Sequence, residues 1–432
     1  MNFRHYIRLN FQALCFALFS TFILFVLHHL PVNQIFIDPF SEAIKQHDVM
    51  DIAFSKFRDH NKIELFDTNI VVLNSGITNR ANLAKTITLL NAYKVRAMGI
   101  DILFDTMSTQ SPKADTLLQS AIKQSKNLVL GYIFIENKHG DNKFSFPKTK
   151  PFFSASTKQG YVNLATNDNF SVRAYEPYHQ FEKGKEPAFS TQIALTAFPE
   201  YESRLTSRNS EKQWINFRRV QPGAVSMIFP INSGRATHYT LMDIDVFLRD
   251  SSLYKENNYF KNKVVLIGFV GESEKALSMK DRWFTPLNEQ YTGRSLPDMS
   301  GVFIHANILS MVFDDDFIDD IPEWVLYLIA IFIFYLNYLV FSRILSRLKP
   351  AGGVLIRLIQ VLEFSVLFTI SVVLLVKLNM KLSFFLIATS VILSFELFEI
   401  YERRLEHSVD LWISKVRNRL KLSSNSNENT SN

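Results

Sequence analysis

The sequence predicts an α/β extracytoplasmic domain, mainly a parallel sheet covered by helices, on an all-α membrane anchor of four transmembrane helices. Short apolar runs alternate with helical apolar repeats between residues 70 and 135, which is the pattern of a helix-covered parallel sheet. One apolar segment before this region and three after it have the roughly 20 residues needed to cross a bilayer. Arg and Lys residues beside these segments indicate which side is cytoplasmic.

The first apolar segment covers residues 11–30 and follows Arg4 and Arg8. A cleavable signal peptide is the alternative interpretation, but it usually has a shorter apolar core and a small-x-small cleavage site. This segment ends in His28 and His29 instead. We therefore expect an anchor that stays on the protein.

The water-side part of the chain shows strand and helix patterns in turn. Short apolar runs bounded by polar residues predict strands, at 70–73, 97–105, 128–135, 161–165, 214–217 and 264–268. Apolar residues at helical spacing predict helices, at 83–93, 117–122, 189–198 and 301–313. Together these elements predict one α/β domain.

Three further apolar segments, 324–342, 358–376 and 382–400, follow this domain. Basic residues precede the first segment of the chain and follow its second and fourth, so both termini are expected in the cytoplasm. The predicted parts are a cytoplasmic end and anchor (1–30), an extracytoplasmic domain (31–321), a three-helix transmembrane bundle (322–402), and an amphipathic helix with a disordered cytoplasmic tail (403–432).

Composition excludes several classes of protein. The single cysteine, Cys15, lies in the first apolar segment, so no intrachain disulfide and no cysteine metal site is expected outside the membrane. The net charge of +6 arises from basic residues near membrane ends, which topology explains without nucleic acid. No cofactor is expected.

Polar residues near strand ends are candidate ligand contacts. Asp101 and Asp105 lie within and at the end of a predicted strand, and α/β sheets bind ligands beyond the carboxyl ends of their strands. Backbone hydrogen bonding or loop capping is the alternative for both. Asn163 and Arg173 frame a strand and turn. Arg173 is suited to clamp an anion, or else to form an internal salt bridge.

His305 and Asn307 lie on the apolar helix 301–313. Two residues correspond to about 200° on a helix, so the two side chains cannot both face one small site. A histidine can change charge near neutral pH, which makes His305 a candidate ligand or proton-sensitive contact. The alternative is a core histidine with all its hydrogen bonds made.

The loop at 268–273 contains two glycines but lacks the Lys-Ser/Thr pair of a phosphate loop. A periplasmic hydrolase built from Ser273, His305 and Asp281 is a further alternative. However, the chain has no Gly-x-Ser-x-Gly motif. The sequence therefore favours a tight turn here, and a protein that is not an enzyme.

Three acidic residues, Glu363, Glu396 and Glu399, occur in or at the ends of the predicted spans. Intramembrane carboxylates are costly, so they indicate either ion pairs with nearby arginines or contacts that fix the bundle or dock a partner helix. Beyond the last span, apolar residues at helical spacing include Trp412. That face is expected to lie on anionic lipid, or to pair with a partner or a second copy.

Four stretches together resemble a known family. VVLIG (264–268), the Thr285–Pro286 loop and GVFIHANIL (301–309) look like the C-terminal signature of the second class of CHASE domain, the cyclase/histidine-kinase-associated sensory extracellular domain. MDIAFSKFR (50–58), GIDILFD (99–105) and GYVNLATNDNFSVR (160–173) resemble earlier segments of that family. The resemblance covers roughly residues 40–400. It implies a sensory domain in a bacterial cytoplasmic (inner) membrane.

The sequence also departs from this family. The family's first strand usually ends in an acidic residue, whereas here it ends in Leu73 and Asn74, and a Gly-x-Trp-Pro-Trp-like element before Arg80 is missing. No kinase or cyclase segment follows the last span. The resemblance therefore implies an orphan sensor that binds a small ligand or envelope component and signals through a cytoplasmic partner or a homodimer. A structural module of an envelope complex is the alternative.

Overall fold

The computed structural model describes residues 3–29, 48–57, 66–108, 111–136, 144–145, 151–166, 171–181, 184–208, 212–218, 238–272, 278–288, 296–348, 351–406 and 409. The chain divides into two compact units. The sheet unit is Gln46–Ile318, and the helical unit combines Met1–Lys45 with Asp319–Asn432. Each unit is described by itself below.

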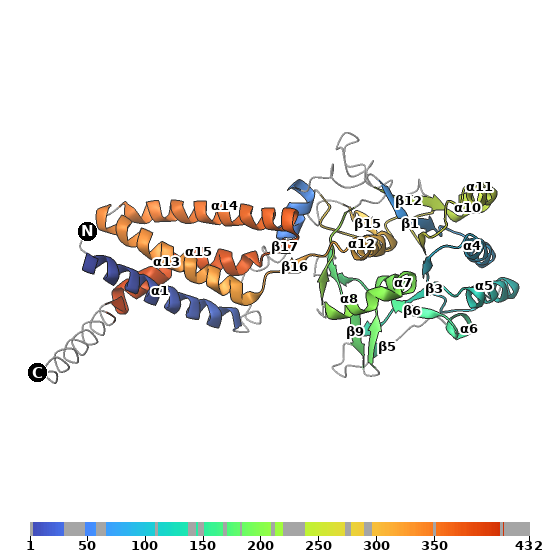
Figure 1. Ribbon diagram of the computed structural model, residues 1–432, viewed down its shortest axis with the longest axis horizontal. Coiled ribbons are helices and arrows are strands. Elements are labelled where there is room, and N and C mark those ends of the chain that lie inside the picture. The colour runs from blue at the N-terminus through green and yellow to red at the C-terminus, as the bar shows by residue number, and fades with distance from the viewer. Residues whose placement is uncertain are drawn as a thin grey trace, which may run out of the picture. The chain divides into compact units, whose positions relative to one another are not determined.

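A six-stranded sheet organises the sheet unit (Figure 1). Its strands lie in the order β12 (His238–Asp243), β1 (Phe66–Asn74), β13 (Val264–Gly268), β2 (Ala97–Asp101), β3 (Leu128–Tyr132) and β6 (Lys158–Tyr161). Every neighbouring pair is parallel. The predicted parallel α/β domain is thereby confirmed. β13, the last strand of this sheet in chain order, inserts between β1 and β2.

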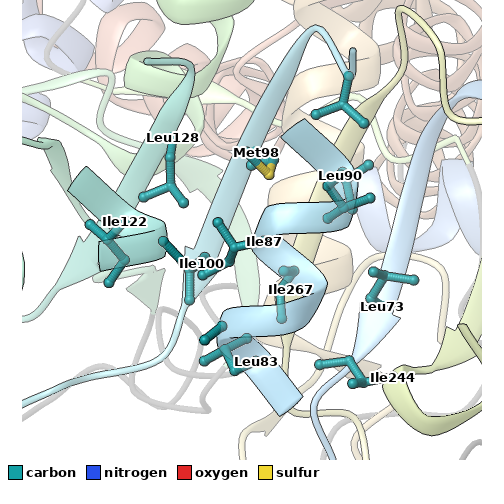
Figure 2. Close-up of a cluster of buried hydrophobic side chains, with 14 of the residues drawn as sticks. Leu73, Leu83, Ile87, Leu90, Met98, Ile100, Ile122, Leu128, Ile244 and Ile267 are labelled. Carbon is teal, nitrogen blue, oxygen red and sulfur yellow. The ribbon is translucent and has the colours of Figure 1, made fainter. Parts of the chain in front are cut away.

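Helices α4 (Arg80–Ala92), α5 (Pro112–Gln124) and α10 (Ile244–Arg249) share one apolar core with the sheet. Figure 2 shows Leu83, Ile87 and Leu90 of α4 directed toward side chains of the strands. These positions repeat every three or four residues, so they form one stripe along the helix. Asn79 caps α4, since its side chain accepts a hydrogen bond from the Asn82 N–H at 2.8 Å.

Helices α7 (Phe189–Ala197) and α12 (Gly301–Phe313) pack against each other and against the sheet strands. Nearly every residue of α12 is buried, as its continuous apolar sequence requires. A Cβ on Gly99 would come within 2.3 Å of the Ile193 side chain, and one on Gly160 within 2.6 Å of the Phe189 backbone. Two glycines therefore allow α7 to approach β2 and β6.

The remaining elements of the sheet unit are short. They are α3 (Val49–Ile52), a π-helical turn (Ala53–Phe57), β4 (Ile135–Glu136), β5 (Phe144–Ser145), α6 (Pro151–Ser154), β7 (Ala165–Thr166), β8 (Val172–Tyr175), β9 (Tyr178–Phe181), β10 (Gly184–Pro187), a 3₁₀ turn (Pro199–Tyr201), α8 (Glu202–Ser207), β11 (Gln213–Trp214), α11 (Ser251–Glu256), β14 (Arg282–Trp283) and β15 (Met299–Ser300).

Some predicted boundaries were wrong. The strand expected at 97–105 ends at Asp101, so Asp105 lies in the following loop. The strand expected at 161–165 is divided between β6 and β7. The sequence analysis also missed β12 and the β9–β10 hairpin, whose mixed polar composition gives no clear alternation.

In the described residues of the helical unit, four helices are long and apolar enough to cross a membrane: α1 (Phe3–His29), α13 (Glu323–Arg347), α14 (Gly352–Leu378) and α15 (Phe384–Arg404). This is the composition of a multi-pass membrane protein. Phe16 of α1 lies in an aromatic cluster with Phe334, Tyr338 and Phe398. Two short strands, β16 (Asp319–Asp320) and β17 (Met380–Lys381), pair in parallel.

Candidate functional site

Four residues form one row across the carboxyl edge of the sheet. Asp243 of β12 is the register partner of Asn74 on β1, Asn74 is the partner of Gly268 on β13, and Gly268 is the partner of Asp101 on β2. Parallel strands present their carboxyl ends at the same edge. Asn74 and Asp243, which are 169 positions apart in the sequence, thus meet where α/β sheets bind ligands.

Asn74 is fully engaged within this row. Its Nδ2 donates to Asp243 Oδ1 at 2.8 Å and to the Gly271 carbonyl at 3.2 Å. Its Oδ1 accepts from the Val270 and Gly76 backbone N–H groups at 2.9 and 3.1 Å. An acidic residue at this position could not donate to Asp243. The amide therefore suits this sheet edge, in place of the acid that the resemblance implies.

Asp101 is different, because its partly exposed carboxyl has no hydrogen bond or ion pair to any residue that the structure describes. Burial and, to a smaller extent, the negative charge of Asp281 raise its pKa to about 7. A Cβ on Gly268 would lie 3.4 Å from Asp101 Cβ and 2.9 Å from Val302 on α12. The strand row and the start of α12 therefore meet at this carboxyl.

Asp281, from the turn before β14, lies beside the N-terminus of α12. Its backbone is left-handed, with φ of 56°, and its carbonyl accepts a hydrogen bond from the Gly301 N–H at 3.1 Å. A Cβ on Gly301 would be 3.0 Å from Asp281 Oδ2. Desolvation raises the pKa of Asp281 as well. Two carboxyl groups therefore lie at this edge, and the charge of Asp281 favours the neutral state of Asp101.

Asp105 lies in the loop after β2 with its side chain exposed. The described residues offer it no hydrogen bond or ion pair. In the same part of the chain, no three His, Cys, Asp or Glu side chains are grouped to hold a metal ion. At this edge of the sheet, the acidic side chains that act on each other are therefore Asp101 and Asp281.

The Thr285–Pro286 loop folds around Asp298, which is 4% exposed. The Asp298 carboxylate accepts hydrogen bonds from the Thr285 N–H at 2.9 Å, from Thr285 Oγ1 at 2.5 Å and from Asn288 Nδ2 at 3.2 Å. Burial raises the pKa of Asp298 to about 6. The sequence analysis missed Asp298, although its position just before the helix at 301–313 could have indicated it.

Arg173 is engaged by Asp51. Arg173 Nε and Nη2 contact the two carboxylate oxygens of Asp51 at 2.8 and 2.6 Å, and the arginine is 8% exposed. This bidentate geometry is the strong form of the interaction. The pair joins two of the stretches that carry the family resemblance, and it leaves the guanidinium committed to an internal salt bridge.

Asn163 holds the backbone after β3. Its Oδ1 accepts from the Phe134 N–H at 3.0 Å, and its Nδ2 donates to the Phe134 carbonyl at 2.8 Å. The Phe134 ring stacks on His179, with centroids 4.7 Å apart. His179 Nδ1 in turn lies 2.8 Å from Glu176 Oε2. This aromatic and acidic cluster was not predicted, since its members come from β9 and the loops around it.

His305 is buried between α7 and the sheet. Its Nδ1 lies 2.7 Å from Ser190 Oγ, and the ring also hydrogen-bonds the Val162 backbone. Burial lowers its pKa to about 4. Ser190 is 1% exposed, so substrate has no access to this Ser–His pair. The hydrolase alternative combines His305 with Ser273 and Asp281. Ser273 lies outside the described residues.

Asn307 makes contacts separate from those of His305, as the helical spacing predicts. Its Oδ1 accepts from the Arg218 N–H at 3.0 Å, and its Nδ2 donates to the Phe303 carbonyl at 3.0 Å. Asn307 is fully buried. It therefore links α12 to the segment after β11.

The three membrane carboxylates have different partners. Glu396 pairs with Arg357 at 2.6 Å, and Glu399 pairs with Arg403 at 3.3 Å. Glu363 instead accepts a hydrogen bond from Asn337 Nδ2 at 3.1 Å. Trp412 lies outside the described residues, while Leu405 and Val409 before it pack against the core of the helical unit.

The family model described as the CHASE2 domain matches residues 59–341. No curated protein matches the chain. No solved structure matches it either. The matched range contains all the strands of the sheet, the Asp101 edge and α12.

Proposed function

The chain belongs to the CHASE2 domain family, and from this premise we propose that it is a membrane-anchored sensor. In this proposal the sheet unit lies outside the cytoplasm and binds a stimulus. The transmembrane helices then pass a conformational shift to a cytoplasmic partner. The family is sensory and not catalytic, and the buried Ser190–His305 pair gives no support to hydrolysis.

One observation carries the location of the stimulus site. Among the candidate ligand residues, Asn163, Arg173, His305 and Asn307 are engaged by internal partners. Asp101 is partly exposed at the carboxyl end of β2, beside a second carboxyl group, and the described residues give it no hydrogen bond. A site with paired carboxyl groups and raised pKa favours a cationic stimulus.

The chain offers a covalent route from this site to the membrane. Asp281 adjoins the first residue of α12, and Val302 packs closely on Gly268 beside Asp101. Nine residues separate the end of α12 from the start of α13 at Glu323. A shift at the N-terminus of α12 is therefore directly linked in sequence to a transmembrane helix.

The charge pattern supports the proposed topology. Arg343 and Arg347 lie at the end of α13, and Arg403 and Arg404 at the end of α15. The positive-inside rule places these ends in the cytoplasm, which leaves the sheet unit on the opposite side. The packing of α1 against α13 and α15 supports its role as a retained anchor. The bacterial inner membrane is the proposed location.

Thermal stabilisation of the purified full-length protein tests the site. The probes are Mg²⁺, Ca²⁺ and small alkylamines at pH 7.5, compared between wild type and Asp101→Asn. A probe that binds the folded state at 100 times its Kd stabilises it by about 2.7 kcal/mol. We expect at least one probe to raise the Tm of the wild type and not that of Asp101→Asn.

Glu256→Gln at the end of α11 is the matched control, because this acidic residue is exposed and lies 13 residues after Asp243 of the row. It should respond to the probe as the wild type does. Equal stabilisation of Asp101→Asn would remove the site from the carboxyl edge. The absence of stabilisation by every cationic probe would argue against a cationic stimulus there.

The signalling step is tested through the C-terminal helix. Deletion of residues 403–421 should leave membrane insertion intact and abolish the recovery of a cytoplasmic partner after crosslinking in the native membrane. Undiminished partner recovery would contradict the proposed output. Recovery of envelope proteins alone, with no cytoplasmic partner, would instead favour a structural module.

A further inference from the structure

Glu363 is a carboxyl group placed well inside the membrane span. It lies 11 residues after Gly352, the start of α14, which corresponds to about 16 Å along the helix axis. The hydrocarbon layer is about 30 Å thick. Its neighbours Val361 and Leu362 are 65% and 64% exposed on the outer face of α14, and Glu363 itself is half-buried. Lipid-soluble molecules can therefore reach this carboxyl group.

The group that faces Glu363 from α13 is Asn337, which is fully buried. Its Nδ2 donates to Glu363 Oε2 at 3.1 Å and to Ser394 Oγ of α15 at 3.2 Å. Its Oδ1 is buried and finds no hydrogen-bond partner in the described part of the chain. A buried amide oxygen without a partner is unusual, and it indicates that the amide also serves a second arrangement.

Arg357, six residues before Glu363 on α14, is engaged by other residues. Arg357 Nη2 donates to Glu396 at 2.6 Å, and its Nη1 donates to Gln360 Oε1 at 3.2 Å. An ionised carboxylate in hydrocarbon is costly unless it is paired. Among the described residues, the hydrogen bond from Asn337 Nδ2 is therefore the polar contact that the Glu363 carboxyl group has.

The elements packed on α14 carry other charged residues that could pair with Glu363. They are paired or lie toward helix ends: Glu323, Arg343 and Arg347 on α13, Lys377 on α14, Lys381 on β17, and Glu399, Glu402, Arg403 and Arg404 on α15. None of them has an ion pair with Glu363 in the described residues.

An amide can serve both states of a carboxyl group. Its nitrogen donates to an ionised carboxylate, and after a rotation of 180° its oxygen accepts the proton of a neutral carboxyl. Ser394 Oγ accepts from Asn337 Nδ2 and donates to the Val391 carbonyl at 2.7 Å. In the second orientation its O–H turns from Val391 to Asn337 Oδ1, because a hydroxyl both donates and accepts. The buried Oδ1 of Asn337 is then the acceptor that a protonated Glu363 requires.

We propose that Glu363 and Asn337 form an intramembrane proton-binding site, in which the Asn337 amide accommodates both protonation states of Glu363. A change of state alters hydrogen bonds that join α13, α14 and α15. The site goes beyond the proposed sensory function and does not depend on it, since it rests only on contacts within the helical unit.

The test uses dicyclohexylcarbodiimide on the full-length protein in lipid nanodiscs, between pH 5.5 and pH 9. The reagent reacts with protonated carboxyl groups in apolar surroundings. The O–H adds across one C=N bond, with oxygen going to carbon and the proton to nitrogen. The adduct then rearranges to a stable N-acylurea without loss of atoms. Peptide mass spectrometry locates it. We expect adducts at Glu363 that fall at least fivefold over this range.

Three variants sharpen the test. Glu363→Gln should abolish the adduct, and Glu396→Gln should leave it. A hydrogen bond donated to an ionised carboxylate is stronger than one accepted from a neutral carboxyl, so loss of the amide in Asn337→Leu should raise the pH of half-maximal labelling by about one unit. Val366→Glu in a Glu363→Leu background places a carboxyl one turn away on the lipid-facing side without an amide partner. Its profile should resemble that of Asn337→Leu and confirms reagent access.

Each remaining outcome decides against the site. The absence of a Glu363 adduct at every pH, while the Val366→Glu control is labelled, would show that Glu363 stays ionised. A yield that is constant across the range would show that no proton is exchanged. An Asn337→Leu labelling profile equal to that of the wild type would show that the Asn337 amide does not affect proton binding at Glu363.

Discussion

Two regions of the sheet unit hold ionisable side chains. One is the interior around β8 and α12, and the other is the carboxyl end of β2. In the interior, Arg173 has a bidentate contact with Asp51 and His305 has Ser190 and Val162. At the end of β2, the burial of Asp101 and the negative charge of Asp281 both disfavour the ionised form of the Asp101 carboxyl. The interior contacts stabilise the fold, whereas the Asp101 edge costs stability.

This difference separates structural from functional candidates. A residue whose polar atoms are satisfied by its own chain gains little from a ligand, because binding would have to replace contacts that already exist. A residue held in an unfavourable charge state gains from any cation that neutralises it. The comparison therefore favours Asp101 over Arg173 as the contact for a stimulus, although both belong to stretches that resemble the family.

The largest effect is expected from Arg173→Met. Breaking a buried ion pair leaves the other charge without compensation, so the variant should lose about 3–5 kcal/mol of unfolding free energy. Urea unfolding of the full-length protein in detergent, followed by protease resistance of the sheet unit, measures this loss. A loss well below about 1 kcal/mol would mean that Arg173 contributes little to stability and belongs with Asp101 among the functional candidates.

Arg249→Met is the matched control. Arg249 pairs with Asp250 at 2.9 Å, but its side chain is 70% exposed. Exposed pairs contribute little, because water and salt screen them. The urea midpoint of this variant should equal that of the wild type.

The interior contacts also show where sequence analysis stops. Regular spacing predicted α4, α5 and the strands around them, since Leu83, Ile87 and Leu90 repeat along one helix face. The partner of Arg173 lies 122 residues earlier in the chain. Nothing in the local pattern at Asp51 indicates that contact, so the internal salt bridge remained one of two alternatives.

The Asp101 edge was predicted only in part. The end of a buried strand marked Asp101 as a candidate, because the carboxyl edge of a parallel sheet is a common binding location. Its neighbours follow from register with β13 and β1, which come from distant parts of the chain. Asp281 acts from a left-handed turn that belongs to no strand or helix pattern. The charge state of Asp101 therefore required the structure.

A smaller effect is expected from His305→Leu. The substitution leaves Ser190 and the Val162 carbonyl without their partner, which should cost about 2–3 kcal/mol at pH 8. The folded-state pKa of His305 is lowered to about 4, from 6.5. The wild type therefore loses this stability as pH falls from about 6.5 through 4, and the Leu variant does not. The difference in urea midpoint should narrow between pH 7 and pH 4.

Ser190→Ala provides the control for this pH dependence. It removes one hydrogen bond and keeps the buried imidazole, so its stability should still fall between pH 6.5 and pH 4. A His305→Leu variant with the same pH slope as the wild type would show that another group carries the slope.

The smallest effect is expected from Asp101→Asn, and it is a gain of stability instead of a loss. It tests the carboxyl end of β2. The folded-state pKa of Asp101 is raised from 3.8 to about 7, so its contribution to stability is present below about pH 4 and is lost as pH rises through 7. Asp101→Asn keeps the shape and removes the charge. It should gain about 1–2 kcal/mol at pH 8, less than the full shift implies, because the carboxyl is partly exposed.

At pH 4 the gain should disappear, since the wild-type carboxyl is then neutral as well. Asp105→Asn, in the exposed loop after β2, should leave the urea midpoint unchanged at both pH values. A loss of stability in Asp101→Asn at pH 8 would mean that the carboxylate is engaged in the folded protein. Asp101 would then belong with Arg173 among the structural residues, and the stimulus site would have to be sought elsewhere on the sheet unit.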